Sequence, residues 1–340
     1  MTTHSVCLLP KLEGTGGPSV FQTKLRQGLE RHGIPVHFDP TQADCASILV
    51  IGGTSQLLNV WRAKQRGVHI VQRLDGINWL HRLRPTGLRH YLRAERNNWI
   101  LAFIRRHMAD SVVYQSNFAR DWWQTRYHDI QARSQVIYNG VDLHVFTPQG
   151  VEKPPKDSIH VLVIEGSFSG GYDTGLQNAV EFAHGLSQIN QRKVKLNIIG
   201  QVPEDVVKNI NQTYRNLVHW MGRIPHKKIP AINRQAHMLF SADINAACPN
   251  TVIEAIACGL PVIAYATGSL PELIQGDAGR TAPYGSDYWK LEPPNPQALV
   301  QAAMEILADQ PHFRTAARAH AERHFSLEKM TEQYLAVLRI

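Results

Sequence analysis

Short apolar runs alternate with amphipathic stretches along the whole chain. In the first half, runs of four or five residues are typical of buried strands, and they cover residues 6–9, 48–51, 69–73, 111–115 and 135–138. Amphipathic stretches typical of helices separate these runs. Strands that alternate with helices in this way predict a parallel sheet covered by helices.

The same pattern starts again after the polar, proline-bearing segment TPQGVEKPPKDS, with strand-like runs at residues 160–164, 195–199, 238–241 and 261–264. We therefore predict an α/β chain with two doubly wound, Rossmann-like domains over residues 1–150 and 151–322. A C-terminal helix over 323–340 is expected to pack back toward the first domain. Ligands bind at the carboxyl ends of strands in such sheets, so motifs placed there carry the most weight.

Composition excludes disordered and fibrous classes, because 43% of the 340 residues are hydrophobic and 19% are charged. The formal net charge of +8 favours an anionic partner: a nucleotide, a phosphorylated lipid, an acidic glycan or nucleic acid. Four widely separated cysteines indicate neither a disulfide framework nor a metal site. Without a signal peptide or a membrane-spanning apolar run, we expect a soluble, cytoplasmic protein.

A glycine-rich turn follows the first predicted strand, in EGTGGPSVFQTKL. Gly16 and Gly17 precede an amphipathic helix, so backbone N–H groups there could approach a phosphate, assisted by the helix dipole. A tight strand-to-helix turn without a ligand explains the same two glycines equally well.

The stretch CPNTVIEAIACGLPV is more informative. Asn250 is expected to cap a helix whose first exposed N–H groups belong to Thr251, Val252 and Ile253, which could hold a diphosphate. Glu254, expected in the first turn, could accept hydrogen bonds from two neighbouring hydroxyls, as on a ribose. The alternative is that Glu254 only complements the helix dipole.

Residues 250–274 resemble the donor-site signature of retaining nucleotide-sugar glycosyltransferases of the GT-B fold, of the family-4 type (glycosyl transferases group 1). Further matches follow in the family's order: GGPSVFQTKL, VQRLDG, VYQSNFARDW, YNGVDLHVF and MGRIPHKKIP. The resemblance implies two domains that face across a cleft, with a C-terminal helix that crosses back. It also implies a nucleotide-sugar donor, a glycan or lipid-linked acceptor, and no metal or cofactor.

The resemblance also shows what this chain has lost. Two acids eight positions apart flank the donor site in the family; Glu254 matches the second, which binds the ribose, but Ala246 stands at the first, which contacts the transferred sugar. Relatives carry an arginine and a lysine that grip the diphosphate where this chain has Ser167 and, nearby, Tyr172. Losing both cations would weaken phosphate binding by about 1.5–3 kcal/mol each.

Three features could compensate for those losses or complete the site. Arg223 follows a strand-like segment and could reach the phosphates, and the backbone at Gly170 and Gly171 could approach them. Asp75, at the end of another predicted strand, could orient an acceptor hydroxyl or act as a base, which are roles that the family places in this loop. A turn or cap role remains an equal alternative for Asp75 and the two glycines.

Residues 78–107 are crowded with arginine and interleaved with aromatic residues. Leu88, Leu92, Trp99 and Phe103 fall along one helical face, so this face could belong to the core, with the arginines as its solvated side. Alternatively, the stretch could meet an anionic membrane surface at the inner face of the membrane, or line a groove for an acidic glycan. Nucleic acid is not expected as a partner, because no recognised binding module is present.

Two functions therefore compete. The first is a retaining glycosyltransferase that moves a hexose from a nucleotide sugar to a glycan or lipid-linked acceptor, as in polysaccharide biosynthesis. The second is a non-catalytic or weakly active relative that binds a nucleotide or a partner glycosyltransferase. The second hypothesis rests on Ala246, Ser167 and Tyr172, since all three departures fall in the donor site.

Overall fold

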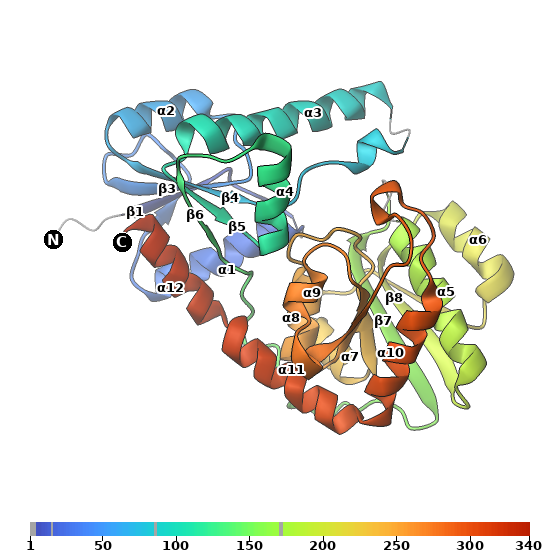
Figure 1. The fold of residues 1–340 in the computed structure, drawn as a ribbon. Helices are drawn as coiled ribbons and strands as arrows, with labels where there is room; N and C mark the ends of the chain where they lie inside the picture. Colours follow the sequence, from blue (N-terminus) through green and yellow to red (C-terminus); the bar gives the residue numbers. More distant parts are fainter. Residues whose placement is uncertain (1–4, 15, 85–86, 170–172) are drawn as a thin grey trace. The chain divides into compact units, whose positions relative to one another are not determined.

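A computed structural model describes residues 5–14, 16–84, 87–169 and 173–340, which fold into two compact units (Figure 1). The first unit contains Met1–Gly140 and Ser326–Ile340, and the second contains Val141–Phe325. Each unit holds a six-stranded sheet, and all the strand pairs in both sheets are parallel. The predicted α/β class is confirmed.

The sheet of the first unit has the strand order β2-β1-β3-β4-β5-β6. Its strands are β1 (Ser5–Leu9), β2 (Val36–His37), β3 (Cys45–Ile51), β4 (His69–Leu74), β5 (Ser111–Tyr114) and β6 (Arg133–Val136). Its helices are α1 (Gly17–Arg31), α2 (Leu57–Gln65), α3 (Leu88–Phe103), α4 (Asn117–Tyr127) and α12 (Leu327–Leu338), with a short 3₁₀ turn at Leu80–Arg82 and a π-helical turn at Ile104–Met108.

The last helix, α12, belongs to the first unit because it packs against α1, β3 and β4. The rings of Phe21 and Tyr334 lie 5.3 Å apart. The two helices approach so closely at Gly28 that a Cβ there would lie 2.2 Å from Thr331 Oγ1. A larger side chain at position 28 would therefore force the helices apart.

The sheet of the second unit has the strand order β12-β11-β10-β7-β8-β9. Its strands are β7 (Ser158–Ser167), β8 (Lys193–Gln201), β9 (Val218–Gly222), β10 (Met238–Phe240), β11 (Val262–Tyr265) and β12 (Gly279–Ala282). Its helices are α5 (Asp173–Ile189), α6 (Glu204–Tyr214), α7 (Ile229–Arg234), α8 (Asn250–Ala257), α9 (Leu270–Leu273), α10 (Pro296–Ala308) and α11 (Gln310–His324), with 3₁₀ turns at His226–Lys228, Gly276–Ala278 and Tyr288–Lys290.

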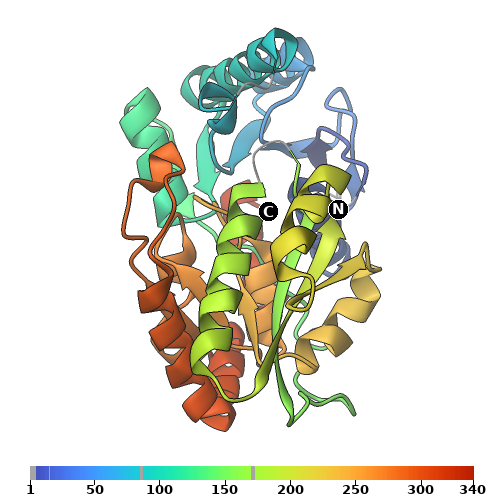
Figure 2. The same cartoon turned by 90° about the vertical axis from the view of Figure 1, so that its right-hand side faces the viewer.

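Helices lie on both faces of this second sheet. Helices α5 and α10 lie side by side on one face (Figure 2), where they share a core with Val161, Leu196 and Val218 of β7, β8 and β9. Helix α8 packs against α7 and α11. Because α8 follows β10, its N-terminus lies at the carboxyl edge of the sheet, where doubly wound folds bind their ligands.

The units divide at residues 140 and 141, ten residues before the position expected from the sequence, and the chain returns to the first unit at Ser326. The reason is that the segment after Gly140 is tied to α11. Arg318 donates hydrogen bonds to the carbonyls of Leu143 (3.2 Å) and Phe146 (2.8 Å), and the Val141 N–H donates to the Phe325 carbonyl at 2.8 Å.

Helix α3 corrects one sequence-based interpretation. Leu88, Leu92 and Trp99, which a helical spacing suggested as core residues, are 74%, 58% and 62% exposed. The buried face of α3 is formed by Ala94, Asn98 and Leu101 instead. Spacing shows which side chains share a face of a helix, but it does not show which face is covered.

Candidate functional site

The N-terminus of α8 differs in detail from the expectation. The helix begins at Asn250, so Pro249 occupies the N-cap and no side chain caps the helix; the prediction that Asn250 is the cap is wrong. The Ile253 N–H already donates to the Pro249 carbonyl, at 3.4 Å. The N–H groups that precede the first intrahelical bond are therefore those of Asn250, Thr251 and Val252. They remain the groups able to meet an anion.

Glu254 is the fifth residue of α8, beyond the first turn, and it is only 3% exposed. Its Oε1 lies 3.0 Å from Nε2 of His226, whose ring centroid is 5.3 Å from that of Phe146. Burial of a carboxylate is costly unless it is paired, and His226 provides such a pairing. A role limited to the helix dipole does not explain this arrangement, since the dipole acts mainly in the first turn.

His226 was not singled out from the sequence. It stands in MGRIPHKKIP beside the two lysines, and its side chain is 53% exposed whereas that of Glu254 is 4% exposed. The sequence could have indicated His226 in only one way: it lies in a segment that resembles the glycosyltransferase family. A contact between residues 28 positions apart could not be read from spacing alone.

The position of the missing acid is enclosed by backbone. Ala246 is 2% exposed, and its carbonyl accepts a hydrogen bond from the Ser269 N–H at 2.9 Å. Gly268 has a φ of +58°, and a Cβ there would lie 2.6 Å from the Ala246 nitrogen. Asn245 precedes Ala246 with a φ of +62°. The loop thus fixes the backbone of Ala246, and its side chain is buried.

The structure describes some of the residues predicted to bind phosphate, but not all of them. Ser167 ends β7, and its Oγ lies 2.9 Å from Ser169 Oγ. Gly170, Gly171 and Tyr172 lie outside the described residues. Arg223 is exposed just after β9 and donates a hydrogen bond to Oε1 of Gln201, at the end of β8. The structure therefore pairs Arg223 with Gln201, whereas Glu254 is paired with His226.

Two neighbouring carboxyl groups near the carboxyl edge of the second sheet were not expected from the sequence. Glu165 lies near the end of β7, and Asp243 follows the neighbouring strand β10. Burial raises the pKa of both groups, and the charge of Asp243 raises the pKa of Glu165 further. Two such neighbours are not both ionised at neutral pH, because each disfavours the charge of the other.

In the first unit, Asp75 directly follows β4, and its carbonyl accepts a hydrogen bond from Trp123 Nε1 at 2.7 Å. Burial raises the pKa of the Asp75 carboxyl, and the charge of Arg73 partly opposes that shift. Arg73 itself lies 3.6 Å from the centre of the Phe21 ring and donates to Asn139 Oδ1 at 2.8 Å. A carboxyl with a raised pKa at a strand end is suited to proton exchange.

The glycine turn is placed at the same edge of that sheet. Gly17 is the first residue of α1 and Gly16 is its N-cap, with an ordinary φ of −70°. A Cβ at Gly16 would meet no described atom within 4 Å, so neither packing nor backbone strain requires a glycine there. Strand β3 lies between β1 and β4, so one strand separates this turn from Asp75.

No group of three or more His, Cys, Asp or Glu side chains in the described part of the chain could hold a metal ion. The four cysteines are free and buried. Among the described helices, none is long and apolar enough to cross a membrane.

Comparison with known proteins identifies the second unit. Residues 161–309, which include α8, match the family described as "Glycosyl transferases group 1". The match covers less than half of the chain, so it shows that this segment is similar to the group 1 glycosyltransferases. One subunit of the human phosphatidylinositol N-acetylglucosaminyltransferase is a relative, 25% identical over 145 residues. That match covers 41% of this chain but only 28% of the human protein.

Solved structures extend the likeness to the whole chain. Sucrose-phosphate synthase from Thermosynechococcus elongatus is similar with a TM-score of 0.73 and 17% identity, over 99% of this chain and 98% of that one. Anabaena HepE in complex with UDP-glucose gives a TM-score of 0.67 at 17% identity, and WaaG, a glycosyltransferase involved in lipopolysaccharide biosynthesis, gives 0.68 at 14%. Each of these two matches covers 98% of this chain and 99% of the other. The predicted GT-B fold is confirmed, and the predicted resemblance to the group 1 glycosyltransferases is confirmed for residues 161–309.

Proposed function

We propose that this chain is a group 1 glycosyltransferase that retains the anomeric configuration as it moves a sugar from a nucleotide sugar to a glycan or lipid-linked acceptor, without a metal or cofactor. One observation carries the proposal: the buried carboxylate of Glu254, held by His226 at 3.0 Å, stands one turn beyond the open N–H groups of α8. These two features together match a nucleoside diphosphate, whose phosphates are anionic and whose ribose carries two adjacent hydroxyls.

The donor then binds along α8. The N–H groups of Asn250, Thr251 and Val252 hold the diphosphate, and Glu254 accepts hydrogen bonds from the ribose hydroxyls. UDP is the first nucleotide to test, because HepE was solved with UDP and with UDP-glucose. Arg223 lies on the same unit and can add a positive charge if it exchanges Gln201 for a phosphate oxygen.

Chemistry on this donor needs no residue that attacks the sugar. The bond between the anomeric carbon and the diphosphate oxygen breaks, and its electron pair leaves with the nucleotide. The acceptor oxygen bonds to the same face of that carbon and gives its proton to the departing diphosphate. The protein contributes by orienting the two substrates and by stabilising the negative charge on the leaving group.

Asp75 is proposed to orient the acceptor hydroxyl. Burial raises the pKa of its carboxyl, and its place after β4 puts it at the ligand-binding edge of the first sheet. The Asp75→Asn variant keeps the shape and removes the charge. We expect it to lower kcat while the affinity for UDP stays unchanged.

We also propose that α3 contacts an anionic membrane that bears the acceptor. Its exposed face carries Leu88, Leu92 and Trp99 together with exposed Arg93 and Arg96. Apolar side chains enter the interface of a bilayer, and each arginine near an anionic surface contributes about 1 kcal/mol. This combination of apolar and basic residues fits a lipid surface better than a solvated helix.

Sedimentation with lipid vesicles tests this contact. The wild-type chain is expected to bind vesicles that contain phosphatidylglycerol and to bind pure phosphatidylcholine weakly. Replacing Arg93 and Arg96 with glutamine should weaken binding to the anionic vesicles by about tenfold or more. The matched control replaces Lys208 and Arg215, two exposed cations of the second unit, and equal losses in both double variants would rule out α3 as the contact.

Titration with UDP and a panel of nucleotide sugars, followed by product analysis with candidate acceptors, tests the proposed activity. Transfer with retention of the anomeric configuration supports the proposal. A chain that binds nucleotide sugars but neither transfers nor hydrolyses them across the panel would instead be the non-catalytic relative.

A further inference from the structure

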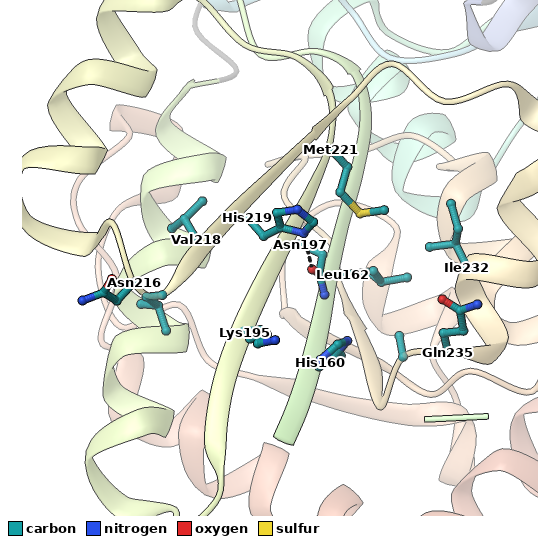
Figure 3. A pocket seen from close by; sticks show the side chains of 12 residues that line it. His160, Leu162, Lys195, Asn197, Asn216, Val218, His219, Met221, Ile232 and Gln235 are labelled. Atoms are coloured by element: carbon teal, nitrogen blue, oxygen red, sulfur yellow. Dashed lines mark hydrogen bonds between the residues drawn. The ribbon is translucent and has the colours of Figure 1, made fainter. Parts of the chain in front are cut away.

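A pocket lies on one face of the sheet in the second unit, and no residue of α8 lines it. It encloses about 380 Å³ and is formed by β7, β8, β9 and the end of α7 (Figure 3). His160, Lys195 and Asn197 line it, and they alternate along their strands with the core residues Val161 and Leu196. Since side chains alternate between the faces of a strand, the pocket lies on the face opposite the core that contains α5.

The strand register brings the polar side chains of this pocket together. His160 of β7 is paired with Lys195 of β8, and Asn197 of β8 is paired with His219 of β9. Partners on neighbouring strands are about 5 Å apart, so the four side chains form one compact group. His219 Nδ1 lies 3.1 Å from Asn197 Oδ1, which leaves Nε2 of the ring for another partner (Figure 3).

The charge of this group is not balanced within the pocket. No Asp or Glu is among the residues that line it, and the side chain of Lys195 makes no hydrogen bond or ion pair with any residue in the described ranges. Burial, and then the charge of Lys195, lowers the pKa of His160. The Asp157 carboxylate, which is not among the lining residues, is linked to His160 through Ser158 Oγ. A half-buried ammonium without a counter-ion favours an anionic ligand.

The rest of the pocket defines the body of the ligand. A volume of about 380 Å³ is larger than one phosphate or carboxylate group requires and lies within the range of small-molecule sites. Asn216 and Gln235 offer amide groups, whereas Leu162, Met221 and Ile232 offer apolar surface. Amides suit hydroxyl groups, and aliphatic side chains suit the C–H groups of a sugar ring.

We propose that this pocket binds a sugar that carries one anionic group, a phosphate or a carboxylate, with Lys195 as the counter-ion and His219 as a hydrogen-bond partner. The site is separate from the donor site, because neither Glu254 nor any other residue of α8 is among the residues that line it. The proposal does not depend on the proposed transfer reaction. Binding here requires neither a nucleotide nor an acceptor.

Calorimetric titration of the wild-type chain, without nucleotide, tests the proposal with three probes: glucose 6-phosphate, glucuronate and glucose. We expect one or both of the anionic sugars to bind at least tenfold more tightly than glucose, and the stronger of the two identifies the anionic group. Inorganic phosphate should compete only if that group is a phosphate. Equal binding of all three sugars, or no binding of any, would overturn the proposal.

Two variants locate the binding. Lys195→Gln should weaken the favoured probe by about tenfold or more, whereas Lys208→Gln, the same change on exposed α6, should leave its affinity unchanged. If Lys195→Gln does not fold, the ring resonances of His219 in the wild-type chain replace it as the readout. They should shift on saturation with the probe, and unchanged resonances would show that the sugar binds elsewhere.

Discussion

Replacing Glu254 with alanine is expected to weaken UDP binding by about 100-fold. The carboxylate is 3% exposed, and Oε1 lies 3.0 Å from His226 Nε2, so it is oriented before a ligand arrives. Hydrogen bonds to a charged group contribute about 1.5–3 kcal/mol each, and a ribose offers two hydroxyls. Because one carboxylate oxygen already accepts a hydrogen bond from His226, we use the lower value of about 1.5 kcal/mol for each of the two hydrogen bonds. The total loss of about 3 kcal/mol corresponds to a roughly 100-fold increase in Kd.

Calorimetry with two nucleotides gives the sharper form of this test. UDP and 2′-deoxy-UDP differ by one of the hydroxyls that Glu254 is expected to bind. The wild-type chain should prefer UDP by about tenfold, and Glu254→Ala should lose most of that preference. Glu204→Ala removes an acid from the first turn of α6 in the same unit and should change neither affinity. An alanine variant that still prefers UDP as strongly as the wild type would refute the ribose role.

Three other substitutions in the second unit have measurable consequences. His226→Ala should weaken UDP binding by about tenfold in calorimetry, since it releases Glu254 from its fixed position; an unchanged affinity would show that the pairing does not orient the carboxylate. Ala246→Glu should lower the unfolding free energy in urea by about 2 kcal/mol or more, because the site is 2% exposed; a variant as stable as the wild type would show that the loop has room for the acid. Burial raises the pKa of Glu165 and of its neighbour Asp243, so the folded state holds more protons than the unfolded state between about pH 4 and neutral pH, and stability falls as the pH rises through this window. Glu165→Gln should flatten that fall in urea unfolding across the same pH range, and an unaltered slope would contradict the raised pKa.

Most of the fold could be predicted because its strands are continuous apolar runs. The runs at residues 48–51 and 160–164 fall inside β3 and β7. Strands of this kind are apolar along their length because helices cover both faces of a parallel sheet. Strands β2 and β12 were missed. The first has only two residues, and the second reads GRTA, so neither has an apolar run. Local patterning cannot reveal a strand that depends on its neighbours for pairing.

The parts of the candidate site that lie together on one helix could be predicted from the sequence. The open N–H groups and Glu254 both belong to α8, whose start differs from the prediction because Pro249 takes the N-cap. His226 and the pair of Glu165 and Asp243 could not be predicted, since tertiary contacts bring them together from segments far apart in the sequence. Periodicity predicts on which face of a helix or strand a residue lies, but not which distant residue it contacts.

We propose that the donor site built on α8 supports transfer although Ala246 replaces the first acid. The most direct test of this proposal measures UDP released from UDP-glucose, and from other UDP-sugars, with and without glycan and lipid-linked acceptors. We expect release of UDP that requires an acceptor in the wild-type chain and is lost in Glu254→Ala. Nucleotide sugars that bind to the wild-type chain without any release of UDP, whichever acceptor is added, would contradict it.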